Sequence, residues 1–116
     1  MNLGRLGENF ALRFLEAKNY EPVDKNFRFQ RAEIDIIVKK DSENLLVFVE
    51  VKTRRSKKFG TPEEGITQKK TEQIYKSAEG FLSKNPEYID YIKRFDIIAI
   101  MMEGNKETIT HFENAF

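Results

Sequence analysis

Residues 46–55, LVFVEVKTRR, have the apolar pattern of a strand that runs into a hydrophobic core, yet charged side chains occupy the second half. Because the side chains of a strand alternate between its two faces, three valines are expected on a core face: Val47, Val49 and Val51. The opposite face then carries Phe48, Glu50 and Lys52. The fold therefore has to place a glutamate and a lysine beside its core.

A second strand pattern precedes this one, and the polar, turn-forming residues 41–44 (DSEN) join the two. The two strands are expected to pair as an antiparallel hairpin. On the earlier strand, alternation puts Glu33, Asp35 and Ile37 on one face. The other face is expected to carry Ile34, Ile36 and Val38. Each strand of the hairpin thus offers a carboxylate, Asp35 from one and Glu50 from the other.

If these two carboxylates share a face, their mutual repulsion raises the pKa of one of them unless a cation lies between them. Mg²⁺ and Mn²⁺ prefer oxygen ligands and keep several waters, so two carboxylates, a backbone carbonyl and a phosphate oxygen make a suitable shell. Lys52 could then position or deprotonate an attacking water. This pattern favours metal-dependent hydrolysis of phosphodiester bonds.

The same residues also fit a plainer interpretation. A glutamate and a lysine two positions apart on a strand often form a solvated face, with a surface ion pair worth about 0–1 kcal/mol. Asp35 favours the catalytic interpretation, because aspartate is depleted in strands and this one stands in an apolar run.

The rest of the chain supplies helices and further strands. Helical spacing of apolar residues predicts a first helix over residues 3–18, with Asn19 as a left-handed stop, and a second helix that Thr67 could cap and that ends near Asn85 and Pro86. Residues 56–65 are expected to form an exposed loop. Strands are predicted over residues 23–29, 33–39, 45–53, 95–102 and 107–112. The order α-β-β-β-α-β-β predicts an α/β fold with a mixed sheet flanked by helices.

Composition limits the class of protein. A chain of 116 residues is expected to form a single domain over residues 1–116, and it contains no cysteine. It has no apolar run of membrane-spanning length and no apolar signal core near its first residues, so we expect a soluble, cytoplasmic protein without a membrane partner. His111, the one histidine, is expected to pack or to hydrogen-bond rather than to bind a metal.

Charge is balanced overall, at +1, but basic residues gather locally. Those that could contact a nucleic-acid backbone at the mouth of the site are Arg54, Arg55, Lys57, Lys58, Lys69 and Lys70. The alternative is that the first four only keep an exposed loop in solution.

Several segments, in order along nearly the whole chain, resemble the YraN-like family of small bacterial proteins. They are GRLGENFALRFL, NFRFQRAEIDIIV, LLVFVEVKTRRSKKFGTPEEGIT, RFDIIAI and HFENAF. The resemblance implies a restriction-endonuclease-like fold with the PD-(D/E)xK arrangement, and a more remote similarity to archaeal Holliday-junction resolvases.

By this resemblance, Asp35 matches the metal-binding aspartate, Glu50 the second acidic ligand and Lys52 the lysine of the motif. Glu8 matches a glutamate placed above the metal, and the backbone carbonyl of Val51 could be a further ligand. Lys70 matches a basic position that could meet phosphate. Glu33 is an accessory candidate beside Asp35.

Two departures from the family pattern leave these residues in place. Ala32 stands where the family usually has glycine, and Ile34 stands where a proline would precede the aspartate.

Two hypotheses follow. The first is a nuclease that depends on Mg²⁺ or Mn²⁺ and acts on nucleic acid, with DNA expected ahead of RNA and branched DNA among the candidates. The second is a nucleic-acid-binding or protein-docking module that keeps the fold without chemistry. A homodimer could enlarge the small surface of such a chain, since junction-cutting relatives use paired sites.

Overall fold

The computed structural model describes residues 2–55 and 67–116. Within them, helices and strands follow in the predicted order α-β-β-β-α-β-β. The helices are α1 (Leu3–Ala17) and α2 (Gln68–Lys84), and short 3₁₀ turns lie at η1 (Asp41–Glu43) and η4 (Pro86–Tyr88). The strands are β1 (Glu21–Phe29), β2 (Ala32–Lys40), β3 (Leu45–Arg54), β4 (Ile92–Glu103) and β5 (Lys106–Phe112).

The helix ends follow from local side-chain chemistry. The Asn2 side chain accepts a hydrogen bond from the backbone N–H of Arg5 at 2.8 Å, which caps α1. Asn19, just past the end of α1, has a left-handed φ of +71°, as predicted. The Thr67 hydroxyl accepts from the backbone N–H of Lys70 at 3.1 Å, which confirms the predicted cap of α2.

The five strands form one sheet in sequence order, β1-β2-β3-β4-β5. Neighbouring strands are antiparallel except for β3 and β4, which run parallel, so the sheet is mixed as predicted. Parallel neighbours need a crossover connection, and α2 lies within the one that joins β3 to β4. No helix in the described ranges is both long and apolar enough to cross a membrane.

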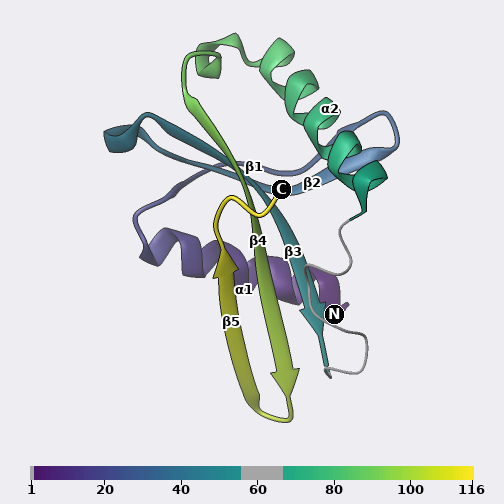
Figure 1. Ribbon diagram of the computed structural model, residues 1–116. Coiled ribbons are helices and arrows are strands. Elements are labelled where there is room, and N and C mark those ends of the chain that lie inside the picture. Colours follow the sequence, from purple (N-terminus) through teal and green to yellow (C-terminus); the bar gives the residue numbers. More distant parts are fainter. Residues whose placement is uncertain (1, 56–66) are drawn as a thin grey trace.

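The sheet has a hydrophobic core on each face. Val47 and Val49 pack with Ala11 and Leu15 of α1, as expected for the valine face of β3. On the opposite face, Phe48 is buried with other apolar residues and with Phe81 of α2. Figure 1 shows α1 crossing behind β3, β4 and β5. It also shows α2 lying over β1 and β2 near the turn that joins these two strands. Both faces of β3 are therefore apolar until the chain reaches Glu50.

One expectation about β2 is wrong. Ile36 and Val38 belong to the core beside α1, as predicted. Ile34 does not share their face, because it packs with Ile37 in the core beside α2. The alternation of β2 is therefore interrupted between Ile34 and Ile36, at Asp35.

The pairing of the strands explains the interruption. The ladder between β2 and β3 ends at the pair of Ile36 with Val49, so residues before Ile36 lose the regular support of β3. On the other side, Lys25 pairs with Ile36 and Phe27 pairs with Ile34, and Asn26 between them has a left-handed φ of +52°. A left-handed residue does not continue the pleat of a strand. Asp35 thus lies where β2 parts from β3.

Close packing brings α1 onto β3. Gly7 is buried, and a Cβ built at this position would overlap the hydroxyl of Thr53. The absence of a side chain at Gly7 therefore sets how near the first turns of α1 come to the sheet. Glu8, the next residue, is carried toward β2 by the same approach.

Replacing Gly7 with alanine should destabilise the fold by about 1–3 kcal/mol, because the added methyl group has no space against Thr53. The free energy of unfolding in urea measures this effect. Gly4→Ala is the matched control on the same helix, since a Cβ there would meet only Asn2, at an ordinary 3.5 Å. Gly4→Ala should leave stability unchanged or raise it. Equal stability of the two variants would contradict the packing argument.

Candidate functional site

Asp35 is fixed to β3 by a hydrogen bond that takes the place of strand pairing. Its Oδ2 accepts from the backbone N–H of Val51 at 2.7 Å. Asp35 directly precedes Ile36, and Val51 lies two residues after Val49, the last residues of the two strands that pair with each other. The side chain of Asp35 is thus held at the point where the strands separate. Val51 contributes its N–H to this contact, and the role expected for its carbonyl stays a prediction.

Three carboxylates from two elements, α1 and β2, meet at this point. Glu8 of α1, Glu33 of β2 and Asp35 of β2 each offer an oxygen, and the three oxygens lie within 4.8 Å of one another. We call these three residues the acidic cluster. Two of them, Glu8 and Asp35, were predicted as metal ligands, and Glu33 as an accessory. The cluster has the oxygen chemistry that Mg²⁺ and Mn²⁺ prefer.

The surroundings of Asp35 penalise its negative charge. Burial, and then the neighbouring carboxylate of Glu50, raise its pKa from the usual 3.8 to about 7, although the Val51 hydrogen bond acts in the opposite direction. Glu8 and Glu33 raise it further. Without a cation, Asp35 is therefore half protonated near neutral pH, and a bound cation would favour its charged form.

Glu50 lies in a different set of contacts. Its Oε1 is 3.3 Å from the Lys52 ammonium group and 2.7 Å from that of Lys70 at the start of α2. The side chains of Glu50, Lys52 and Lys70 are 11%, 14% and 31% exposed, so these are sheltered ion pairs. The structure thus brings Glu50 together with both lysines, and Glu8 together with Asp35. We call Lys52, Glu50 and Lys70 the lysine–glutamate triad.

The two lysines of the triad differ electrostatically. Burial, followed by the nearby Lys70, lowers the pKa of Lys52 below its usual value despite the attraction of Glu50. Burial acts most strongly on the pKa of Lys70 and lowers it, but hydrogen bonds to Glu50 and Lys52 and the negative charges of Glu50 and Asp35 together leave the pKa raised. Lys52 therefore gives up a proton more readily than an ordinary lysine, whereas Lys70 holds its charge more firmly.

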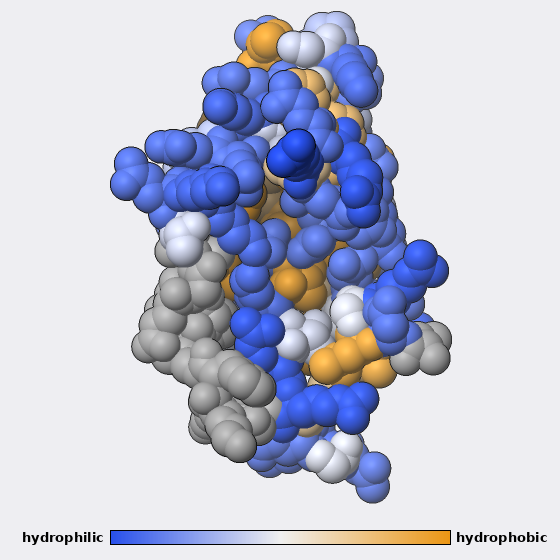
Figure 2. Space-filling view, turned by 90° about the vertical axis from the view of Figure 1, so that its right-hand side faces the viewer, coloured by the Kyte–Doolittle hydropathy of each residue, from blue (hydrophilic) through white to orange (hydrophobic). Residues whose placement is uncertain are grey.

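An open hollow of about 400 Å³ connects the two groups of residues. It is lined by Glu33, Asp35 and Glu50 and by residues at the start of α2, namely Thr67, Lys69, Lys70, Gln73 and Ile74, with Arg31 and Ala32 at its edge. Figure 2 shows the side of the molecule that faces right in Figure 1, with a hollow in the middle whose rim is largely hydrophilic. Glu8 and Lys52 are not among its lining residues, so the hollow gives a ligand access to Glu33 and Asp35 of the acidic cluster and to Glu50 and Lys70 of the triad.

Only some of the basic residues predicted to contact nucleic acid lie at the hollow. Lys69 is exposed at the hollow and Lys70 is half-buried in it. Arg54 is half-buried at the end of β3 and donates to the carbonyl of Thr53 at 3.4 Å, and Arg55 is exposed; neither is among the described residues that line the hollow. Lys57 and Lys58 lie outside the described residues.

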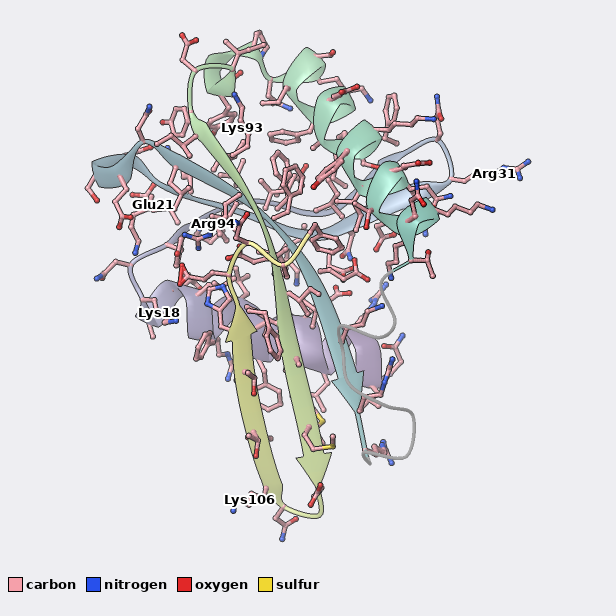
Figure 3. The ribbon with its side chains drawn as sticks, viewed as in Figure 1. Lys18, Glu21, Arg31, Lys93, Arg94 and Lys106 are labelled. Atoms are coloured by element: carbon pink, nitrogen blue, oxygen red, sulfur yellow. The ribbon has the colours of Figure 1, made fainter. Side chains whose placement is uncertain are left out.

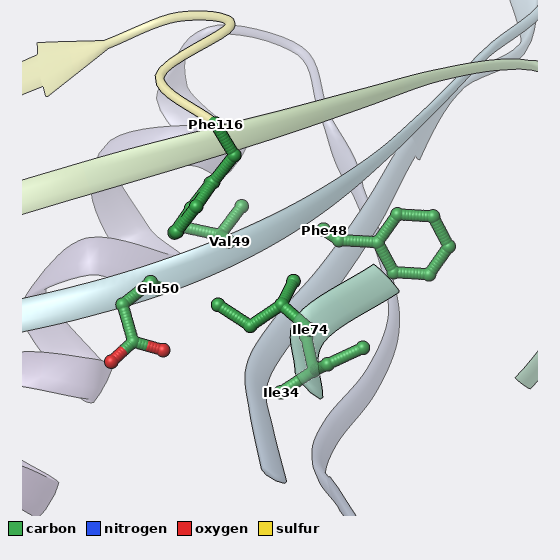
Figure 4. Close-up of a pocket in the computed structure, with 6 residues that line it drawn as sticks. All are labelled: Ile34, Phe48, Val49, Glu50, Ile74 and Phe116. Atoms are coloured by element: carbon green, nitrogen blue, oxygen red, sulfur yellow. The ribbon is translucent and has the colours of Figure 1, made fainter. Parts of the chain in front are cut away.

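Apolar side chains pack beside Glu50 of the triad. A small pocket beside Glu50 is lined by Ile34, Phe48, Val49, Ile74 and Phe116. Figure 4 shows the Glu50 carboxylate pointing away from Phe48 and Ile34, so its charge is turned from the core. Ile34 reaches this pocket only because the alternation of β2 is interrupted at Asp35.

A second polar group, on β4 and β5, is fully satisfied within the protein. Asp96 is completely buried; it lies 2.7 Å from Nε2 of His111 and accepts two hydrogen bonds from Arg94 Nε and Nη2 at 2.9 Å each. Arg94 also donates to the Tyr20 hydroxyl, and Figure 3 labels it beside β4. Burial alone would raise the pKa of Asp96, but the hydrogen bonds from His111 and Arg94 hold it below its usual value. His111 is thus a hydrogen-bonding residue, as expected.

Sequence reasoning missed two residues near the site. Arg31, in the turn between β1 and β2, lines the edge of the hollow and extends outward in Figure 3. Asn26 of β1 donates hydrogen bonds to Glu8 and to Glu33. Asparagine is depleted in strands, so Asn26 inside β1 was the available signal.

The raised pKa of Asp35 predicts how stability depends on pH in the metal-free protein. The unfolded chain loses the Asp35 proton near pH 4 and the folded chain near pH 7, so this group destabilises the fold progressively as pH rises between these values. Asp35→Asn removes the charge and can still accept from Val51. In EDTA, its melting temperature should exceed that of the wild type at pH 8, with a much smaller difference at pH 4. An advantage that is largest at pH 4 would contradict the assigned pKa.

Comparison with known proteins places these residues in a family. A family model described as "Uncharacterised protein family UPF0102" matches residues 7–100. A UPF0102 protein of Caldicellulosiruptor bescii is 45% identical over 121 residues, covering 100% of both chains. Others from Flavobacterium psychrophilum and Syntrophomonas wolfei are 43% and 40% identical, covering 99% and 98% of this chain and 93% and 96% of theirs.

The family match includes Glu8, Asp35, Glu50, Lys52 and Lys70, and the relatives align over nearly their whole length. The resemblance to the YraN-like family found in the sequence is thereby confirmed. This chain belongs to the UPF0102 family.

Proposed function

We propose that this protein is a nuclease that uses Mg²⁺ or Mn²⁺ to hydrolyse phosphodiester bonds in nucleic acid, with DNA ahead of RNA. The observation that carries the proposal is one hollow, at the parting of β2 and β3, that is lined by Glu33 and Asp35 of the acidic cluster and by Glu50 and Lys70 of the lysine–glutamate triad. Oxygen ligands for a divalent ion and amines for a phosphate thus lie side by side.

The acidic cluster suits a divalent cation by its donors and by its charge. Glu8, Glu33 and Asp35 would hold the ion, and the pKa of about 7 for Asp35 reflects burial and repulsion that a cation would offset. When bound, such an ion supplies positive charge to the phosphate and lowers the pKa of a coordinated water. Glu50 adds to the negative potential felt at Asp35.

The two lysines of the triad have different roles in this proposal, proton transfer for Lys52 and phosphate binding for Lys70. The pKa of Lys52 is lowered, so its amine more readily becomes neutral, and the neutral amine can accept a proton from the attacking water. Lys70 keeps its charge and stands at the start of α2, where the backbone N–H groups also favour an anion. We propose that phosphate oxygens replace Glu50 as the partner of Lys70 when substrate binds, which frees Glu50 to face the acidic cluster.

The remaining basic residues have supporting roles in this proposal. Lys69 at the rim of the hollow is suited to contact the phosphate backbone without reading bases. The predicted backbone contacts of Arg54, Arg55, Lys57 and Lys58 belong to the proposal as well. A homodimer would bring two such hollows to one substrate, and sedimentation of the protein with and without a four-way junction tests that arrangement.

The metal site is tested by calorimetric titration of Mn²⁺ into the wild type and Asp35→Ala. Removal of the Asp35 carboxylate should abolish measurable Mn²⁺ binding, because it leaves only Glu8 and Glu33 as carboxylate ligands. Asp90→Ala, at an exposed turn far from the cluster, is the matched control and should bind as the wild type does. Equal binding by Asp35→Ala and wild type would contradict the assignment of the site.

The chemistry is tested with Lys52→Met on labelled linear, single-stranded and four-way-junction DNA. Loss of a positioned proton acceptor should slow cleavage about 10²–10⁴-fold while Mn²⁺ binding persists. Lys106→Met, at the exposed first residue of β5, is the control and should cleave at the wild-type rate. Nucleic-acid binding that falls steeply with salt but yields no product in the wild type would favour the non-catalytic module instead.

A further inference from the structure

Asn26 links two of the three carboxylates of the acidic cluster. Its side-chain amide donates to Oε1 of Glu8 at 3.0 Å and to Oε1 of Glu33 at 3.0 Å. Glu8 comes from α1 and Glu33 from β2, whereas Asn26 lies in β1. One amide group therefore holds together glutamates from two other elements of the fold.

The backbone at Asn26 suits this role and few other residue types. Its φ of +52° is left-handed, a conformation that asparagine tolerates better than most residues other than glycine. It lies between Lys25 and Phe27, whose partners in β2, Ile36 and Ile34, flank Asp35, the third member of the cluster. An amide offers two N–H donors, which matches the two acceptors. Aspartate would have no donor, and glycine would have no side chain.

Other contacts complete the orientation of the glutamates. The Oε2 of Glu33 lies 3.2 Å from Nε of Arg28, so each oxygen of Glu33 has its own partner. Each glutamate is thereby held by a group outside the cluster. Because the amide of Asn26 is neutral, it orients the two glutamates without cancelling the negative charge of the cluster. Glu50 differs in that it pairs with two cations, Lys52 and Lys70, whereas Glu33 pairs with one cation, Arg28, and with the neutral amide of Asn26.

We propose that Asn26 is a positioning residue of the metal site, which holds Glu8 and Glu33 in place for the cation before it arrives. The inference rests on the proposed function, because it concerns the same acidic cluster. Groups that orient metal ligands by hydrogen bonds typically change metal affinity 10–100-fold when they are removed. Asn26 acts through the two glutamates and is not itself a ligand in this proposal.

The test is calorimetric titration of Mn²⁺ into the full chain with Asn26→Gly, which permits the left-handed backbone and removes the amide. The dissociation constant for Mn²⁺ should rise about 10–100-fold. Asn26→Ser, which keeps one shorter donor, should also bind more weakly than the wild type and serves if the glycine variant does not fold. Wild-type affinity in either folded variant would overturn the positioning role.

Two controls separate positioning from general stability. Asn9→Ala removes a neighbouring contact between α1 and β1, the 3.1 Å hydrogen bond from Lys25, without touching the cluster. Val23→Ala weakens the core under β1 and lowers the melting temperature. Both should bind Mn²⁺ as the wild type does; weakening in Val23→Ala equal to that in Asn26→Gly would overturn the proposal. Absence of Mn²⁺ binding by the wild type would instead overturn the proposed function itself.

Discussion

The hydrogen bond from the Val51 N–H to Asp35 marks the point on which the site depends. Up to the pair of Ile36 with Val49, β2 and β3 are held by a regular antiparallel ladder. Beyond that pair the strands part, and a carboxylate takes the place of a backbone acceptor. The separation opens space between the hairpin and α2, and the same bond fixes Asp35 at the edge of that space.

The hydrophobic cores on the two faces of the sheet position the helices that carry Glu8 and Lys70. Packing of α1 against the valine face, allowed by Gly7 next to Thr53, brings Glu8 to Asp35. Packing of α2 against the face of Phe48 brings Lys70 to Glu50. The site therefore draws on both helices and on the hairpin between them. Burial supplies the electrostatic character, because it raises the pKa of Asp35 and lowers that of Lys52.

Much of this arrangement could be predicted from periodicity and turn chemistry. The element order, the hairpin and the valine core face follow from strand alternation, and Asp35 next to β3 follows from the hairpin. The departure of Ile34 from its expected face could not be predicted, because it depends on where pairing with β3 ends. The grouping of Glu33 with Glu8 depends on the contact of a distant helix. Two residues at odds with local propensity were the available signals. Asn26 in a strand pointed to the irregularity of the hairpin, and Gly7 in a helix pointed to the close approach of α1.

We propose that the acidic cluster binds a divalent cation, and crystals grown with Mn²⁺ would reveal such an ion by diffraction. Anomalous scattering at the manganese edge locates the ion without assumptions about activity. We expect a peak about 2.0–2.3 Å from carboxylate oxygens of Glu8, Glu33 and Asp35. A protein crystallised at saturating Mn²⁺ that shows no peak there, or shows one only at other surface carboxylates, would contradict it.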